Sequence, residues 1–103
     1  MPNKNYIKGY NKELKAKHEL EAEGYIVIRS AGSHGPVDLV AIDINFIRLI
    51  QLKSTVKHGA SMTQYRDDVR KLTELLTPLN VRKEIWLWRA RKGWDKHNIC
   101  EYD

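Results

Sequence analysis

Three polar residues in otherwise apolar stretches could together hydrolyse a phosphodiester bond. Asp38 lies at the start of one apolar stretch, and Gln51 and Lys53 lie at the end of the next. A carboxylate, an amide carbonyl and the backbone carbonyl of Leu52 are oxygen ligands of the kind that Mg²⁺ binds, with Mn²⁺ as a substitute. The lysine could orient or deprotonate the attacking water, or steady the phosphate. These residue types therefore predict a metal-dependent nuclease centre.

The chemistry requires a fold that brings these residues together, and a β-hairpin does so. Residues 37–43 and 46–53 read as two strands joined by a two-residue turn. Counting outward from that turn places Asp38 opposite Gln51. Because side chains alternate along a strand, Lys53 shares the face that carries both.

The same pattern has structural explanations. An aspartate at the start of a strand is commonly a capping group, and a lysine at the end of a strand is commonly solvated. Among apolar neighbours, Asp38 and Lys53 are costly to bury unless they pair or bind something. An Asp38–Lys53 ion pair would meet that cost as well as a metal site would, so the residues alone leave both explanations open.

The rest of the chain predicts the frame around this hairpin. The expected elements are a helix over residues 6–23, a strand over 25–29, a loop over 30–36, a second helix from 61 to a stop at Pro78, and strands over 83–91 and 97–102 with a turn at 93–95. Gly24 occupies the usual position of a helix C-cap glycine. The predicted fold is a single α/β domain over residues 1–103. A small mixed central sheet is flanked by two helices in the order α-β-β-β-α-β-β.

Composition narrows the class of protein. The 103 residues carry a net charge of +5, which favours a polyanionic partner such as DNA. Cys100 stands alone, so no internal disulfide forms, and no stretch has the length of a membrane span. We therefore expect a cytoplasmic protein without membrane contact. The Gly-rich turn around Ser33 lacks the spacing of a nucleotide-binding loop, so no nucleotide cofactor is expected.

Two further groups of residues are ambiguous from the sequence. Trp86 and Trp88 share one strand face, where packing in the core or in a dimer interface is favoured over base stacking. We expect a dimer interface on exposed apolar surface of the last two strands. Basic residues near those strands could form a solvated edge or a DNA contact: Arg82, Lys83, Arg89, Arg91, Lys92 and Lys96.

Several stretches of the sequence resemble one family. They are Lys8-Gly9 and Glu13, the run from Gly24 to Ser33, the run Val37-Asp38-Leu39-Val40-Ala41, the run Ile50-Gln51-Leu52-Lys53-Ser54, and Gly93-Trp94. In type and order they are similar to the archaeal Holliday junction resolvases, a branch of the PD-(D/E)XK nuclease superfamily with the restriction-endonuclease-like fold. The similarity extends from Lys8 to the final strand.

The resemblance implies roles for individual residues. Asp38 would bind the metal, Lys53 would be the catalytic lysine, and Glu13 would complete the metal shell directly or through water. Arg29 would contact DNA at the junction, as would a segment bearing a serine that approaches the scissile phosphate. That segment includes Ser30, Ser33 and His34. Apart from the resemblance, Lys8 and Lys12 on the first helix could contact phosphate or only water. The resemblance further implies a homodimeric crossover junction endonuclease of DNA recombination and repair, in an archaeal cell or a virus-infected host.

The sequence also departs from the family. Gln51 stands where the family usually has glutamate, which removes one negative charge and should weaken metal binding. Leu14 stands where the family favours arginine. Two other functions therefore stay open: a DNA-binding protein of the same fold with weak or no catalysis, and a related nuclease acting on other branched or duplex DNA.

Overall fold

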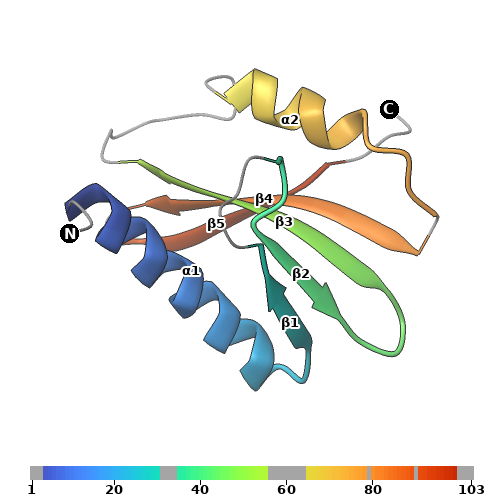
Figure 1. Cartoon of the computed structure of the whole chain (residues 1–103), viewed down its shortest axis with the longest axis horizontal. Helices are drawn as coiled ribbons and strands as arrows, with labels where there is room; N and C mark the ends of the chain where they lie inside the picture. The colour runs from blue at the N-terminus through green and yellow to red at the C-terminus, as the bar shows by residue number, and fades with distance from the viewer. Residues whose placement is uncertain (1–3, 31–34, 56–64, 79, 90, 100–103) are drawn as a thin grey trace.

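A computed structural model of the chain describes residues 4–30, 35–55, 65–78, 80–89 and 91–99. The elements follow the predicted order: α1 (Lys4–Ala22), β1 (Ile26–Arg29), β2 (Leu39–Ile42), β3 (Ile47–Thr55), α2 (Arg66–Thr73), β4 (Val81–Arg89) and β5 (Gly93–Ile99). The strands form one five-stranded sheet in the order β1-β2-β3-β4-β5 (Figure 1). Neighbouring strands are antiparallel except β3 and β4, which are parallel. The mixed sheet with two helices confirms the predicted fold class.

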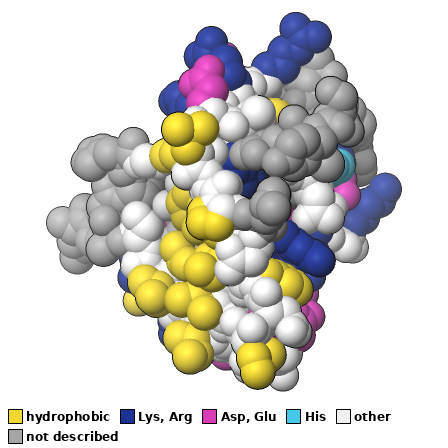
Figure 2. All heavy atoms as spheres, turned by 90° about the vertical axis from the view of Figure 1, so that its right-hand side faces the viewer, with side chains coloured by type: hydrophobic (Ala, Val, Ile, Leu, Met, Phe, Trp, Pro, Cys, Tyr) yellow, Lys and Arg dark blue, Asp and Glu magenta, His cyan; other side chains and the backbone are white. Residues whose placement is uncertain are grey.

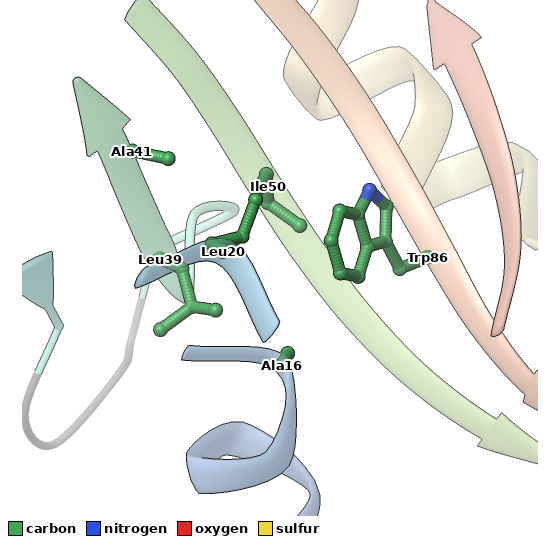
Figure 3. Close-up of a cluster of buried hydrophobic side chains, with 6 residues drawn as sticks. All are labelled: Ala16, Leu20, Leu39, Ala41, Ile50 and Trp86. Atoms are coloured by element: carbon green, nitrogen blue, oxygen red, sulfur yellow. The ribbon is translucent and has the colours of Figure 1, made fainter. Parts of the chain in front are cut away.

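The two helices lie on opposite faces of the sheet (Figure 1), which we call the α1 side and the α2 side. On the α1 side, Ala16 and Leu20 of the helix pack against residues of three strands, and all six side chains of this cluster are buried: Ala16, Leu20, Leu39, Ala41, Ile50 and Trp86 (Figure 3). Burying each of the larger side chains contributes roughly 1.5–3 kcal/mol. Because residues 39 and 50 point to the α1 side, residues 38 and 51 point to the α2 side.

Helix α1 ends where the sequence predicts. Gly24 has a φ of +99°, which favours glycine. The N–H of Gly24 donates to Glu21 O, and the N–H of Tyr25 donates to Leu20 O. These two bonds form a Schellman motif, which satisfies carbonyls at the helix end and turns the chain into β1.

The hairpin between β2 and β3 has the predicted register. Asp43 accepts hydrogen bonds through Oδ1 from the N–H groups of Asn45 and Phe46, and its own N–H donates to Phe46 O at 3.2 Å. These bonds close the two-residue turn, so the ladder pairs Leu39 with Ile50. One step further along, Asp38 lies opposite Gln51, as predicted.

The α1 side also holds a buried ion pair. Arg48 Nε and Nη2 donate to the two carboxylate oxygens of Glu84 at 2.6 and 2.7 Å, and Trp86 Nε1 donates to Glu84 at 2.8 Å. Burial acts to raise the pKa of the Glu84 carboxyl, but the hydrogen bonds from Arg48 and Trp86 outweigh it, so this pKa lies below its usual value. Glu84 is therefore a structural residue.

Some predicted boundaries are wrong. The final strand begins at Gly93 rather than His97, because the chain turns earlier. Arg91 and Gly93 have φ values of +68° and +88°, and the N–H of Lys92 donates to Arg89 O. The predicted turn at 93–95 is therefore part of β5. Strand β3 also extends to Thr55, beyond its predicted end at Lys53. The end of the predicted last strand, 100–102, lies outside the described residues.

Helix α2 is shorter than predicted at its C-terminal end. It ends at Thr73, and Leu76, which falls within the predicted helix, lies beyond the observed one and is fully exposed. The predicted start of this helix at Ser61 lies outside the described residues. Neither of the two helices in the described ranges is both long and apolar enough to cross a membrane.

The prediction of exposed apolar surface on the last two strands is also wrong for the described residues. Trp86 is buried in the core, and Lys12 and Lys15 of α1 lie over the ring of Trp88. Helix α1 thus covers the tryptophan face, which confirms that Trp86 serves packing. The exposed large apolar side chains lie elsewhere, on α1, β1, the β2–β3 turn and the segment after α2: Tyr10, Ile26, Ile28, Ile44 and Leu76.

Candidate active site

Asp38 is held rigidly at the point where β2 begins. Its N–H donates to Ile50 O at 2.9 Å, and its C=O accepts the N–H of Ser30 at 2.9 Å. Strand β3 and the residue that follows β1 thus fix the backbone of Asp38 from both sides, and the residue is only 7% exposed. In the described residues the β2–β3 ladder stops beside Asp38, while β3 continues to Thr55 along β4. The carboxylate therefore lies at the place where two neighbouring strands separate.

The Asp38 carboxylate contacts the strand opposite. Its Oδ2 accepts a hydrogen bond from Gln51 Nε2 at 3.0 Å and another from the N–H of Leu52 at 2.8 Å. The predicted juxtaposition of Asp38 and Gln51 is thus confirmed. The bond from Leu52 also shows the capping role that the sequence left open, because the carboxylate takes a strand N–H where the ladder of β2 has ended.

The oxygen donors at this point fit a hard cation. The N–H and C=O of one strand residue point to the same side, so the carbonyl of Leu52 points towards β2, as its N–H does. Asp38 then offers a carboxylate, Gln51 an amide oxygen and Leu52 a backbone carbonyl, all of the chemistry that Mg²⁺ accepts. This set has one negative charge. Among the described residues no group of three or more histidine, cysteine, aspartate and glutamate side chains lies together.

Lys53 forms an ion pair with a residue that was not predicted to belong to the site. Its Nζ lies 3.2 Å from Oδ1 of Asp68, in the first turn of α2, and the two side chains are 31% and 25% exposed. The signal was present in the helical spacing, because Asp68 precedes the buried Leu72 by four residues and so lies on the same helix face. Asp67 and Lys71, on a different face of the helix, are exposed.

Glu13 and Arg29 lie together on the α1 side. Arg29 Nε donates to Glu13 Oε2 at 2.6 Å, and the guanidinium lies 4.7 Å from the ring centroid of Tyr10. Arg29 pairs with Leu39 in the β1–β2 ladder, so it shares the α1 side with that core residue. The described structure therefore brings Glu13 to Arg29 and leaves it outside the Asp38–Gln51 cluster. Its predicted part in the metal shell stays a prediction.

The predicted DNA contacts are only partly described. Ser30 meets the site through its backbone bond to Asp38, whereas Ser33, His34 and the side chain of Lys8 lie outside the described residues. Lys12 Nζ lies 3.8 Å from the ring centroid of Trp88. Desolvation, followed by the charge of Lys15, lowers the pKa of the Lys12 ammonium.

Lys83, grouped with the basic residues near the last strands, is buried. Its Nζ donates to the backbone carbonyls of Thr73 and Leu75 at the end of α2. A cation there satisfies carbonyls that the helix leaves without partners. Lys83 is therefore a structural residue, and the proposed contact of this basic group with DNA does not include it.

Comparison with known proteins gives two positive findings. The family model described as "Archaeal holliday junction resolvase (hjc)" matches residues 4–101. Among solved structures, Hjc of Archaeoglobus fulgidus, a Holliday junction resolvase, matches with a TM-score of 0.67 and 22% sequence identity. The alignment covers 86% of this chain and 74% of that one, and at this identity it shows a shared fold. The search of curated protein sequences found no match.

Proposed function

Because the chain belongs to the archaeal Holliday junction resolvase family, whose members are endonucleases acting on DNA, we propose that it resolves four-way DNA junctions by metal-dependent, paired nicks. One observation carries the proposal: the 3.0 Å hydrogen bond between Gln51 and the Asp38 carboxylate. It places two oxygen-bearing side chains of neighbouring strands side by side, with Lys53 two residues further along the same face. The net charge of +5 suits a phosphate-rich substrate.

We assign the metal, Mg²⁺ or Mn²⁺, to the oxygens of Asp38, Gln51 and Leu52. When bound, such a cation lowers the pKa of its water and stabilises negative charge on the phosphate. Gln51 can serve through its amide oxygen once the amide turns away from Asp38, because nitrogen and oxygen share one rotating group. Asp38 needs no large movement, since its backbone is fixed on both sides.

Lys53 supplies the positive charge of the reaction. Its ammonium group lies on the face that carries Asp38 and Gln51 and is 31% exposed, so water and a phosphate oxygen can reach it. There it orients the attacking water or stabilises charge on the phosphate. The residues that would contact the DNA are Arg29, Ser30, Ser33 and His34. Recognition would depend on phosphates and junction shape.

A homodimer would supply the second nick. Figure 2 shows hydrophobic side chains gathered in a band over one face of the molecule. Ile26 and Ile28 on β1 are 69% and 54% exposed, although isoleucines are usually buried. Apolar surface of this kind marks an association site in soluble proteins. A two-fold axis through such a surface would present two equivalent sites to the two-fold related strands of a junction.

One observation favours a second candidate, a junction-binding protein with little or no cleavage. Gln51 is neutral and donates its N–H to Asp38, so the pair has a single negative charge. Restoring the acid by Gln51→Glu separates the two functions. A binder gains Mg²⁺-dependent cleavage only with the substitution, whereas a nuclease already cuts without it.

The test is cleavage of an end-labelled four-way junction with Mg²⁺ and with EDTA, beside linear and flapped duplexes of the same sequence. Excess unlabelled linear duplex provides the competition control. Paired nicks in the junction that require metal and survive the competitor would support the proposal. Equal cutting of duplex or flap would assign the protein to a nuclease acting on other DNA, and binding without cutting would identify the non-cleaving candidate.

A further inference from the structure

Lys53, the lysine of the proposed site, contacts a residue of α2, a helix that carries none of the sequence motifs of the family. Lys53 Nζ lies 3.2 Å from Asp68 Oδ1, and Asp68 belongs to α2, the helix that covers the α2 side of the sheet. Leu72, one helical turn later, is fully buried and docks the helix. The carboxylate of Asp68 is therefore carried on a packed element rather than on a loop.

The neighbours of Lys53 on the same face of the sheet show why this contact matters. Gln51 gives the site no charge, and Asp38 Oδ2 is occupied by Gln51 Nε2 and the N–H of Leu52. The ion pair that the structure shows for Lys53 is with Asp68. A lysine side chain is a flexible four-carbon stem, so without an anchor its ammonium group would sample many positions.

We propose that Asp68 is a positioning residue that holds the Lys53 ammonium over the face of the sheet carrying Asp38 and Gln51. This inference rests on the proposed function for its catalytic consequence. Because a small misplacement of a reacting group slows the chemical step, the anchor acts on the rate of cleavage. It has no direct part in DNA binding.

The chain offers a matched control on the same turn of the same helix. Asp67 carries the same charge, but its side chain is 85% exposed and its ion pair is with Arg70 of the same helix. Asp67→Asn and Asp68→Asn thus remove the same charge one residue apart. Only the second removes the contact with Lys53.

We expect Asp68→Asn to lower the single-turnover rate of junction cleavage about tenfold at saturating protein. Junction affinity and the Mg²⁺ concentration at half-maximal rate should stay at the wild-type values. Asp68→Glu should recover most of the lost rate, and Asp67→Asn should cut at the wild-type rate. A raised Mg²⁺ midpoint in Asp68→Asn would overturn the inference by making Asp68 a metal ligand. Equal rates for the two asparagine variants would overturn it as well.

A second measurement does not depend on cleavage. Proteins labelled with ¹³C at lysine Cε report the mobility of each ammonium arm by NMR relaxation, and Lys53→Ala assigns the Lys53 signal. The Lys53 arm should be restrained in the wild type and in Asp67→Asn but mobile in Asp68→Asn. A Lys53 arm equally mobile in all three overturns the inference even if the wild type cuts junctions. If the wild type cuts no junction, the proposed function fails, while the NMR result still decides whether Asp68 anchors the lysine.

Discussion

Both sides of the sheet contain a cluster of charged side chains, but the two clusters differ in their hydrogen-bond partners and in how deeply their charged groups are buried. On the α1 side, Glu84 accepts two bonds from Arg48 and one from Trp86, and the carboxylate is almost fully buried. On the α2 side, the carboxylate of Asp38 contacts an amide side chain and a strand N–H, and Lys53 remains partly exposed. Each cluster satisfies its polar groups. The second also includes an ammonium group, that of Lys53, which is 31% exposed and within reach of water and substrate.

This difference separates stability from chemistry. A buried charge with rigid partners cannot exchange them without unfolding its surroundings, because each lost bond leaves an unsatisfied group. The Lys53–Asp68 ion pair, whose side chains are 31% and 25% exposed, can exchange partners at a lower cost, since water or an ion replaces the lost contact. The α1 side is therefore expected to determine stability, and the α2 side to determine activity.

The largest effect on stability is expected from Glu84→Gln. The substitution leaves Arg48 charged and nearly buried without its carboxylate, which should cost about 3–5 kcal/mol in the free energy of unfolding. Urea unfolding measures this value. Glu74→Gln is the control, because Glu74 is exposed and lies 4.0 Å from Arg70. A Glu84→Gln protein as stable as this control would remove the distinction between the two sides.

Acid should weaken the α1 side through the same pair. The pKa of Glu84 is lower in the folded chain than its usual 4.5, so its contribution to stability is complete above about 4.5 and is lost as the pH falls through the folded value. Wild type should therefore lose more stability below pH 4.5 than Glu84→Gln does. Parallel unfolding curves for the two proteins across that range would contradict this assignment.

A smaller effect is expected on the α2 side from Gln51→Glu. Adding a carboxylate beside Asp38 should lower the Mg²⁺ concentration at half-maximal cleavage about tenfold, or about 1.4 kcal/mol, because the ligands gain one negative charge. In EDTA the same substitution should lower the unfolding free energy, since two carboxylates then face each other. Asn80→Asp, which adds the same charge at an exposed position just before β4, should change neither value. An unchanged Mg²⁺ midpoint in Gln51→Glu would remove residue 51 from the metal ligands.

The smallest effect is expected on junction binding from a substitution of Lys12, and it tests whether the α1 side has a part in DNA binding besides its structural one. If Lys12 contacts phosphate as predicted, Lys12→Gln should weaken junction binding severalfold and reduce the salt dependence of binding by about one charge. Lys17→Gln removes the same charge from the same helix, where Lys17 pairs with Glu21, and should leave binding unchanged. Identical salt dependences for wild type and Lys12→Gln would restrict the DNA-binding surface to other residues.

Local signals made the fold and half of the site predictable. The two-residue turn fixed the hairpin register, which alone places Asp38 opposite Gln51. Gly24 marked the end of α1 because only a residue that tolerates positive φ suits that position. By contrast, the turn before β5 was misplaced. It places Arg91 at positive φ, whereas the glycine that suggested a later turn lies in the strand.

The contacts that could not be predicted join segments distant in the sequence. The pairing of Asp68 with Lys53 requires the position of α2 on the sheet, which no local pattern gives. The burial of Lys83 has the same origin, because its partners are carbonyls at the end of α2. A charged residue on a strand or helix is usually expected to face solvent. Only the packing of α2 on the sheet shows that Lys83 is buried and that Asp68 contacts Lys53.

The central claim is that the α2 side performs the chemistry, and Lys53→Ala tests it most directly. Cleavage of a labelled junction with Mg²⁺, junction affinity and urea unfolding should be measured on the same preparations of wild type and variant. We predict that cleavage falls at least a hundredfold while junction affinity and unfolding free energy stay near the wild-type values. Cleavage at the wild-type rate by a folded Lys53→Ala protein would contradict the claim.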